Sequence, residues 1–133
     1  MSRQWLNNPL IYYPILWGEH IFKKTIFGCH MCGQCMLSYT GFTCPMNCPK
    51  QLRNGPCGGT RAGGMCEVYP ERQCVWNKIY RRNKKLGRLC LMEEVQPPVD
   101  WTLENTAAWV NVFQGKIKPP RLCVNPPKWL RKK

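Results

Sequence analysis

The apolar positions of residues 71–85 recur with the spacing of an α-helix. One face of this stretch carries the larger apolar side chains, Val75, Trp76, Ile79 and Tyr80. Lysine and arginine side chains occupy the other faces, as on a helix that packs one side on a core and leaves the rest in water. The pattern predicts an amphipathic helix over residues 71–85.

A second helix is predicted over residues 103–113. Thr102 precedes it as a capping residue, because a hydroxyl oxygen accepts a hydrogen bond from the free backbone N–H groups of the first turn. Gly115 follows it, and glycine is the residue that most often ends a helix. Residues 95–101 contain two prolines and are expected to link the two helices without regular structure.

The first 28 residues are a different kind of segment, rich in aromatic side chains. These are Trp5, Tyr12, Tyr13, Trp17, Phe22 and Phe27. Pro9 and Pro14 argue against a long helix here, because proline lacks the backbone N–H that a helix interior needs. We therefore expect an extended arm. So many aromatic groups are not left in water on a soluble monomer, so the arm packs on its own domain or, as we favour, on a partner protein.

Glycine and proline set the character of the middle of the chain. The 133 residues include 11 glycines and 12 prolines, mostly around the cysteines, which indicates turns rather than long regular elements. A chain of this length rarely builds a large core unaided, and metal binding can supply part of the folding free energy. The expected fold is a small, irregular, metal-stabilised domain, loop-rich with a few α-helices and little β-structure.

Three sections are expected along the chain. Residues 1–28 would be an aromatic docking arm, and residues 29–115 would be the cysteine-rich metal-binding domain with its two helices. Residues 116–133, which are basic and rich in proline, would form an extended tail.

Eight of the ten cysteines lie within residues 29–74. They are Cys29, Cys32, Cys35, Cys44, Cys48, Cys57, Cys66 and Cys74. The run opens with C-x2-C-x2-C, and thiolates at this spacing converge on one metal ion or cluster because a tight turn presents both sulfurs to the same side. Eight is twice the four thiolates that one iron–sulfur cluster or one structural zinc requires. The sequence predicts two metal sites, with the opening triplet in one of them and the sharing of the other cysteines left open.

Disulfide bonds are the alternative use of so many cysteines, because small secreted domains are often held together by them. Export would require a charged start, a continuous apolar stretch and a cleavage site of small residues. The apolar stretch of residues 9–17 contains Pro14, and no such cleavage site follows it. It is also shorter than the about 20 residues that cross a bilayer. We therefore expect a cytoplasmic protein with reduced thiols and no membrane span.

The type of metal is the next question. Zinc ribbons use two C-x2-C pairs separated by a longer loop, whereas here a cysteine triplet leads and prolines follow Cys44 and Cys48. That combination is typical of bacterial ferredoxins, which bind 4Fe-4S clusters. One departure is that residues 38–40, where the ferredoxin pattern would place a cysteine, contain none. The pattern favours an iron–sulfur cluster, with zinc alone as the alternative.

The remaining thiols and imidazoles are assigned no metal. Cys90 and Cys123 stand alone in the sequence and are most simply unligated. His20 and His30 have a suitable ligand type, but the thiolate count is complete without them. We expect neither histidine to be a ligand.

Four stretches of the sequence carry a resemblance to a known family. They are CHMCGQC, TCPMNCPKQLRNGPCGG, GMCEVYPERQCVW and the later PPVDWTLENTAAWVN. Together they resemble the cysteine-rich domain in the C-terminal region of some methylenetetrahydrofolate reductases. In acetogens and related anaerobes the same domain is a separate small subunit beside a flavin-bearing catalytic subunit. The resemblance covers residues 28–114 and leaves out the arm and the tail.

The resemblance implies a partner: a flavin-bearing (β/α)8 barrel reductase subunit that carries FAD and passes hydride between the flavin and a folate or related pterin. This chain is too short for such a barrel and would not be catalytic alone. The implied role is that of an accessory electron-transfer subunit in a heteromeric oxidoreductase of one-carbon metabolism. One or two 4Fe-4S clusters, or one cluster and one zinc, would relay electrons to the partner's flavin. In the alternative role the metals only hold a docking scaffold for the same reductase.

The charge of the chain suits a negatively charged partner. The formal net charge is +13, and the positive residues concentrate in residues 78–88 and from Lys116 onward. An acidic electron-donor protein or subunit would dock on such a surface. A basic zinc-binding nucleic-acid module is the less favoured alternative, because the chain has neither zinc-finger spacing nor a regular aromatic stacking pattern. We therefore expect no nucleic-acid partner.

Overall fold

The structure is a computed structural model, and it describes residues 7–119. Along the chain these residues form α1 (Pro9–Phe27), the 3-10 helices η2 (Pro45–Asn47) and η3 (Ala62–Gly64), α2 (Val75–Lys85), the 3-10 helices η4 (Leu89–Glu93) and η5 (Trp101–Leu103), and α3 (Ala108–Phe113). The predicted tail lies almost entirely outside the described residues.

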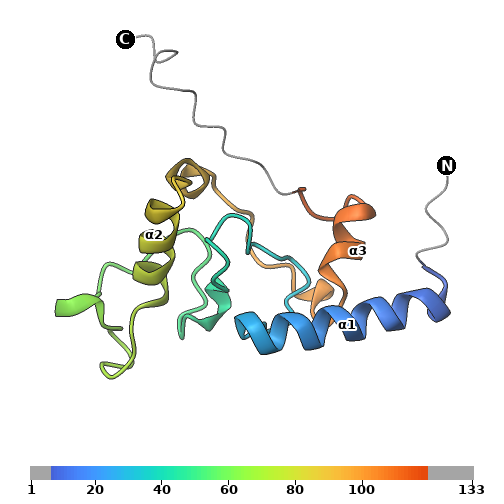
Figure 1. Cartoon of the computed structure of the whole chain (residues 1–133), viewed down its shortest axis with the longest axis horizontal. Helices are drawn as coiled ribbons and strands as arrows, with labels where there is room; N and C mark the ends of the chain where they lie inside the picture. The colour runs from blue at the N-terminus through green and yellow to red at the C-terminus, as the bar shows by residue number, and fades with distance from the viewer. Residues whose placement is uncertain (1–6, 120–133) are drawn as a thin grey trace, which may run out of the picture.

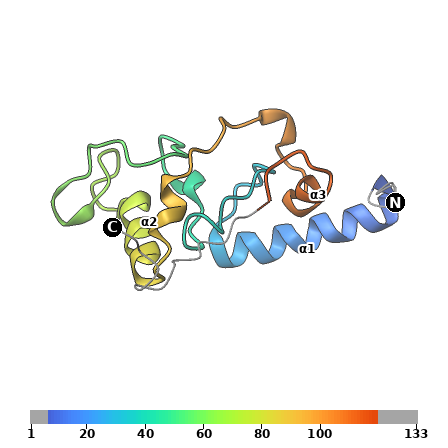
Figure 2. The ribbon, with the colours of Figure 1, turned by 90° about the horizontal axis from the view of Figure 1, so that it is seen from above.

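The helices stand at two ends of the molecule, with the cysteine-containing loops between them. Figures 1 and 2 show α1 and α3 side by side at one end and α2 at the other. No strand occurs within residues 7–119, where pairing is limited to isolated bridges of Met65 with Arg61 and Gln73. The prediction of a small loop-rich domain with a few helices is confirmed for this part of the chain. Metal stabilisation stays a prediction.

Most of the first section, Pro9–Phe27, is a long helix, so the prediction of an extended arm was wrong for these residues. Pro9 occupies the first turn of α1, where its missing N–H removes no helical hydrogen bond. Asn8 caps the helix, because its side-chain oxygen accepts a hydrogen bond from the Leu10 N–H at 3.1 Å. Only Pro14 lies inside the helix. The sequence Asn-Pro at residues 8–9 is therefore a helix start and not a helix breaker.

The two predicted helices of the second half are present, but each begins later than predicted. α2 begins at Val75, and Cys74 is its N-cap rather than part of its first turn. α3 begins at Ala108, because Asn105 adopts a left-handed φ of 61° that interrupts the helical backbone. Thr102, the predicted cap, lies inside η5.

The interior consists of small apolar clusters rather than one core. One joins α1 to α3 and contains Ala107 and Val110, with Tyr12, Ile15 and Leu16 packed against them. Another is built on Cys32, Cys44 and Met46, and a third on Cys74, Trp76 and Ile79. Two of these three clusters contain cysteines, so much of the apolar packing lies around thiols.

Buried side-chain amides hold the cysteine-containing loops against the helices. Asn83 of α2 donates a hydrogen bond to the Tyr39 carbonyl at 2.9 Å. Asn111 of α3 donates one to the Gly33 carbonyl, also at 2.9 Å. Because no strand is available here, these amides satisfy carbonyl groups that would otherwise be buried without a partner. They fix the loop around the opening cysteine triplet between the two ends of the molecule.

None of the helices within residues 7–119 has the length and apolar character needed to cross a bilayer.

Candidate metal centres

The eight clustered cysteines divide between two cavities, four in each. The first cavity is lined by Cys29, Cys32, Cys35 and Cys44. The second cavity is lined by Cys48, Cys57, Cys66 and Cys74. Each has a volume of about 20 Å³. The structure thus adds Cys44 to the opening triplet and separates it from Cys48, a grouping that the sequence left open.

All eight of these cysteines are free thiols in the structure. Cys90 is bonded in a disulfide and lines neither cavity, and Cys123 lies outside the described residues. His20 and His30 line neither cavity. Within residues 7–119 no group of three or more cysteine, histidine or acidic side chains is arranged to hold a metal ion. Sharing a cavity is a weaker condition than ligating one ion, so the metal sites remain a prediction at this point.

The end of α1 positions the first cavity. Gly28 takes a left-handed φ of 61°, and its N–H donates a hydrogen bond to the Lys24 carbonyl at 3.1 Å. The Cys29 N–H donates to the Lys23 carbonyl at 3.3 Å, which completes the usual glycine-terminated helix end. This turn places Cys29 directly after the helix and brings it to the same cavity as the Lys23 side chain.

The thiols of the first cavity interact electrostatically. Burial raises the pKa of the Cys44 thiol to about 11, and charge on Cys29 and Cys32 adds to the effect. Burial also raises the pKa of Cys29, with a further contribution from Cys35, although the Met31 N–H that donates to Cys29 Sγ at 3.3 Å opposes the shift. Cys44 and Cys29 are therefore protonated near neutral pH. A metal that binds them must displace these protons.

Two buried cations line the first cavity. Lys23 is 4% exposed and Arg53 is 8% exposed. Arg53 donates a hydrogen bond from Nη2 to the Gln34 carbonyl at 3.3 Å, but its Nε and Nη1 have no partner among residues 7–119. A guanidinium is always charged, and its N–H groups are costly to bury without acceptors. The surroundings of Arg53 therefore suit an anion.

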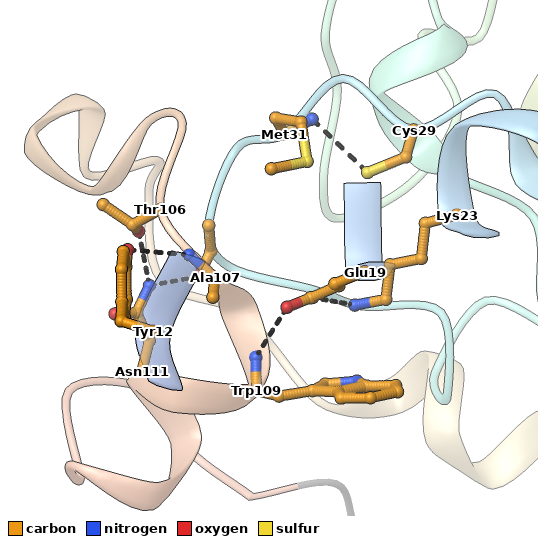
Figure 3. Close-up of polar contacts among 10 residues, drawn as sticks. Tyr12, Glu19, Lys23, Cys29, Met31, Thr106, Ala107, Trp109 and Asn111 are labelled. Atoms are coloured by element: carbon orange, nitrogen blue, oxygen red, sulfur yellow. Dashed lines mark hydrogen bonds and ion pairs between the residues drawn. The ribbon is translucent and has the colours of Figure 1, made fainter. Parts of the chain in front are cut away.

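Lys23 has one acidic partner, which holds it in place. Its ammonium pairs with the Glu19 carboxylate one turn earlier on α1, and both side chains are buried. The other oxygen of Glu19 accepts a hydrogen bond from the Trp109 N–H at the start of α3, at 3.5 Å, as Figure 3 shows. Burial alone would lower the pKa of Lys23, but Cys35 and Glu19 together raise it above its ordinary value. Lys23 is therefore charged at neutral pH.

In the second cavity, one thiol is exposed and the Lys50–Glu67 ion pair lies at the surface. Cys57 is exposed, whereas Cys74 is buried at the start of α2. Glu67 accepts hydrogen bonds from Lys50 at 2.6 Å and from the Cys57 thiol at 3.5 Å. The Thr60 hydroxyl lies 3.7 Å from Cys74 Sγ. No buried lysine or arginine is among the described residues that line this cavity.

The outer face of α1 is the other surface of functional interest. It exposes the apolar side chains Leu10, Tyr13, Trp17, Ile21, Phe22 and Ile26. Trp17 is 71% exposed and borders a shallow groove of about 870 Å³. So much exposed apolar surface on one helix is typical of a site of protein association.

A sequence profile of the methylene-tetrahydrofolate reductase C-terminal family matches residues 13–102. This span is more than half of the chain and contains all the cysteines of both cavities. The chain belongs to this family. The match to the reductase C-terminal family begins inside α1 and ends within η5, so it includes part of the segment that the sequence resemblance left out. No curated protein and no solved structure matches the chain.

Membership of the reductase C-terminal family and the many cysteines fit an accessory subunit that associates with a reductase. Sequence reasoning missed Glu19, Lys23 and Arg53 as residues of the first cavity. The spacing of Glu19 and Lys23, four residues apart on a helix, is a signal for an ion pair, but it is visible only once α1 is recognised as a helix. Nothing in the sequence around Arg53 marks it as buried.

Proposed function

We propose that this chain is an accessory electron-transfer subunit of a flavin-dependent reductase of methylenetetrahydrofolate or a related pterin. The observation that carries the proposal is the division of the eight cysteines into two cavities of four. Four thiolates are the ligand set of one 4Fe-4S cluster. The family match supports the reductase as the partner. The chain is not catalytic alone, and FAD is bound by the partner.

The chemistry of the first cavity suits a 4Fe-4S cluster. Its ligands would be Cys29, Cys32, Cys35 and Cys44. A cluster with four thiolates carries a net charge of about −2, and the unpaired guanidinium of Arg53 and the ammonium of Lys23 are cations in the wall of the same cavity. When bound, such a cluster supplies one-electron transfer at the low potentials that flavin reduction needs. The protein's part is to hold the ligands, keep out water and offset the negative charge.

The second cavity would hold a second cluster or a structural zinc. Cys48, Cys57, Cys66 and Cys74 provide four thiolates, which satisfy either group. Metal analysis distinguishes the two cases. Two clusters give about eight iron atoms per chain, and one cluster with one zinc gives about four iron atoms and one zinc.

The outer face of α1 would dock on the flavin-bearing (β/α)8 barrel subunit. Aromatic side chains such as Trp17 lose little conformational entropy when they are buried in an interface. An acidic donor protein supplies one electron at a time to the accessory subunit. The FAD bound by the partner would supply the hydride chemistry for the folate, and this chain would pass on the two electrons that this chemistry requires, one at a time.

The test uses the two half-reactions of the complex. Cys32→Ser should abolish flavin reduction by the low-potential donor, because it removes a ligand from the first cavity. The partner should still exchange hydride with its folate substrate when an artificial reductant replaces the donor. Cys90→Ser is the comparison variant, because it removes a disulfide bond but no thiol that lines either cavity. It should leave both half-reactions and the metal content unchanged.

Equal loss of both half-reactions in Cys32→Ser would favour the other role in the same complex. The metals would then hold a docking scaffold and carry no electrons. A colourless protein that contains zinc and no iron after isolation without oxygen would also exclude electron transfer through this chain. In that case the nucleic-acid alternative would be tested next.

A further inference from the structure

The first cavity differs from the second in the buried charges that surround it. Lys23, Arg53 and Glu19 all line the first cavity, and each is less than a tenth exposed. Two positive groups and one negative group leave an excess of one positive charge beside the four thiols. At the second cavity the paired Lys50 and Glu67 are both open to solvent, where water and salt screen them.

We propose that Lys23 is a positioning residue whose fixed ammonium beside Cys35 raises the reduction potential of the cluster bound in the first cavity. This inference rests on the proposed function, because it assumes that the four cysteines hold a redox-active cluster. Reduction adds one negative charge to the cluster, so a nearby cation stabilises the reduced form more than the oxidised form. The effect is strong here because Lys23 is buried and poorly screened.

The arrangement around Lys23 keeps its charge directed at the thiols. Glu19 pairs with the ammonium, but its other oxygen accepts the Trp109 N–H on α3, so the carboxylate is held on the side of the helices (Figure 3). The Lys23 Nζ lies 5.4 Å from the centre of the Trp109 ring, which adds a second favourable contact for the cation. Lys23 and Cys35 line the same cavity, and Cys35 helps to raise the pKa of the ammonium. α1 and α3 thus fix the position of Lys23 relative to the first cavity.

The experiment is a redox titration of the complex isolated without oxygen, followed by electron paramagnetic resonance. The signal of the first cavity is identified by its absence in Cys44→Ser. Lys23→Met, in which a side chain of similar length carries no charge, should shift the midpoint of this signal to lower potential. Lys23→Arg keeps the positive charge, so its midpoint should lie close to that of the unaltered chain. Any second cluster in the same chain serves as an internal reference and should keep its midpoint.

Lys24→Met is the matched control, since it removes the same formal charge from the next residue of α1. Lys24 is exposed and lines the outer groove instead of the first cavity, so its charge is screened by solvent. The midpoint of the cluster in Lys24→Met should equal that in the unaltered chain. Because Lys23→Met leaves Glu19 buried without its partner, the pair Glu19→Gln with Lys23→Met is measured as well, and a smaller downward shift is expected because the negative charge of Glu19 is removed too.

Three outcomes would overturn the inference. The first is an unchanged midpoint in a fully loaded Lys23→Met chain, and the second is a shift in Lys23→Met no larger than that in Lys24→Met. The third is a Lys23→Arg chain that fails to load the cluster, which would make Lys23 a purely structural residue. The proposed function fails in a different way, because the unaltered chain would then show no reducible cluster at all.

Discussion

Cys44 and Cys48 lie on either side of the short helix η2 and line different cavities. Cys44→Ser should therefore empty the first site and Cys48→Ser the second, because each removes one thiolate from a different set of four. Each variant should lose the metal of one site only, which is about four iron atoms for a cluster or one zinc for a zinc site, and only the loss of a cluster should remove a spectroscopic signal. Iron and zinc analysis with electron paramagnetic resonance measures both effects. Loss of one and the same signal in both variants would contradict the division into two cavities.

The sequence predicts which cysteines are candidates, but it cannot pair all of them. The spacing of the triplet groups Cys29, Cys32 and Cys35, because a tight turn of two residues between thiols presents them to the same side. The fourth member, Cys44, joins them only because η2 turns the chain between it and Cys48. Such a turn separates two thiols that are close in sequence. Which cysteines share a cavity depends on loop geometry, and the sequence pattern does not predict it.

At Gly33 the cysteine loop passes close to the segment before α3. This glycine has a left-handed φ of 70°, and a Cβ here would collide with the Leu103 carbonyl oxygen and lie 2.7 Å from Thr106 Oγ1. Gly33→Ala should lower the free energy of unfolding by roughly 2–5 kcal/mol, from backbone strain and overpacking together. Urea unfolding of the metal-loaded chain measures the change.

Gly63→Ala is the control for Gly33→Ala. Gly63 has a similar φ of 76°, but nothing lies within 4 Å of the added Cβ. Gly63→Ala should lower the free energy of unfolding only by the backbone strain, roughly 1–2 kcal/mol. Equal losses in the two variants would show that the loop does not approach the segment before α3 closely in solution.

At the scale of elements, α1 has a helical pattern that is overlooked when its prolines are taken to exclude a helix. The positions that face inward, Tyr12, Ile15, Leu16, Glu19 and Lys23, have clear helical spacing. Two of them are charged, so an apolar pattern does not reveal the face. The helices of the second half were easier to predict because apolar residues such as Trp76 and Ile79 fill their buried positions. Even there the buried Asn83 and the exposed Tyr80 depart from the predicted apolar face.

The outer face of α1 gives the prediction at this scale. Trp17→Asp and Ile21→Asp should release the chain from the flavin-bearing subunit, because a charge in an apolar interface is costly to bury. The metal content should not change, since neither residue lines a cysteine cavity. Copurification of the two subunits with metal analysis tests both statements.

Tyr80→Asp is the control for the α1 variants. Tyr80 is an exposed aromatic residue on α2, at the other end of the molecule. It should leave copurification unchanged. Deletion of residues 1–28 is the poorer experiment, because it also removes Glu19 and Lys23 from the first cavity. Full copurification of the two α1 variants would exclude the outer face of α1 as the docking surface.

The whole molecule has two ends of different character. The end formed by α1 exposes apolar side chains, and the end formed by α2 exposes basic ones, including Lys78, Arg81, Lys84 and Lys85. The second cavity adjoins α2, and the first adjoins α1 and α3. This order suits a path in which an acidic donor docks near α2 and the flavin subunit docks on α1. Electrons would then pass from the second cavity to the first when both hold clusters.

That order of docking gives the last prediction. Arg81→Glu and Lys84→Glu should slow association with the acidic donor by roughly tenfold at low salt, because opposite charges steer the two proteins together. The loss should shrink as salt is added, since charges in water are screened beyond about 8 Å at physiological ionic strength. Lys116→Glu makes the same charge change next to α3, where the Lys116 N–H donates to the Asn111 carbonyl, and should have little effect. Stopped-flow reduction of the complex over a range of ionic strengths measures the rates. If Lys116→Glu slows the donor as much as Arg81→Glu does, net charge and not the α2 surface guides the encounter, and the donor does not dock at the end that carries the second cavity.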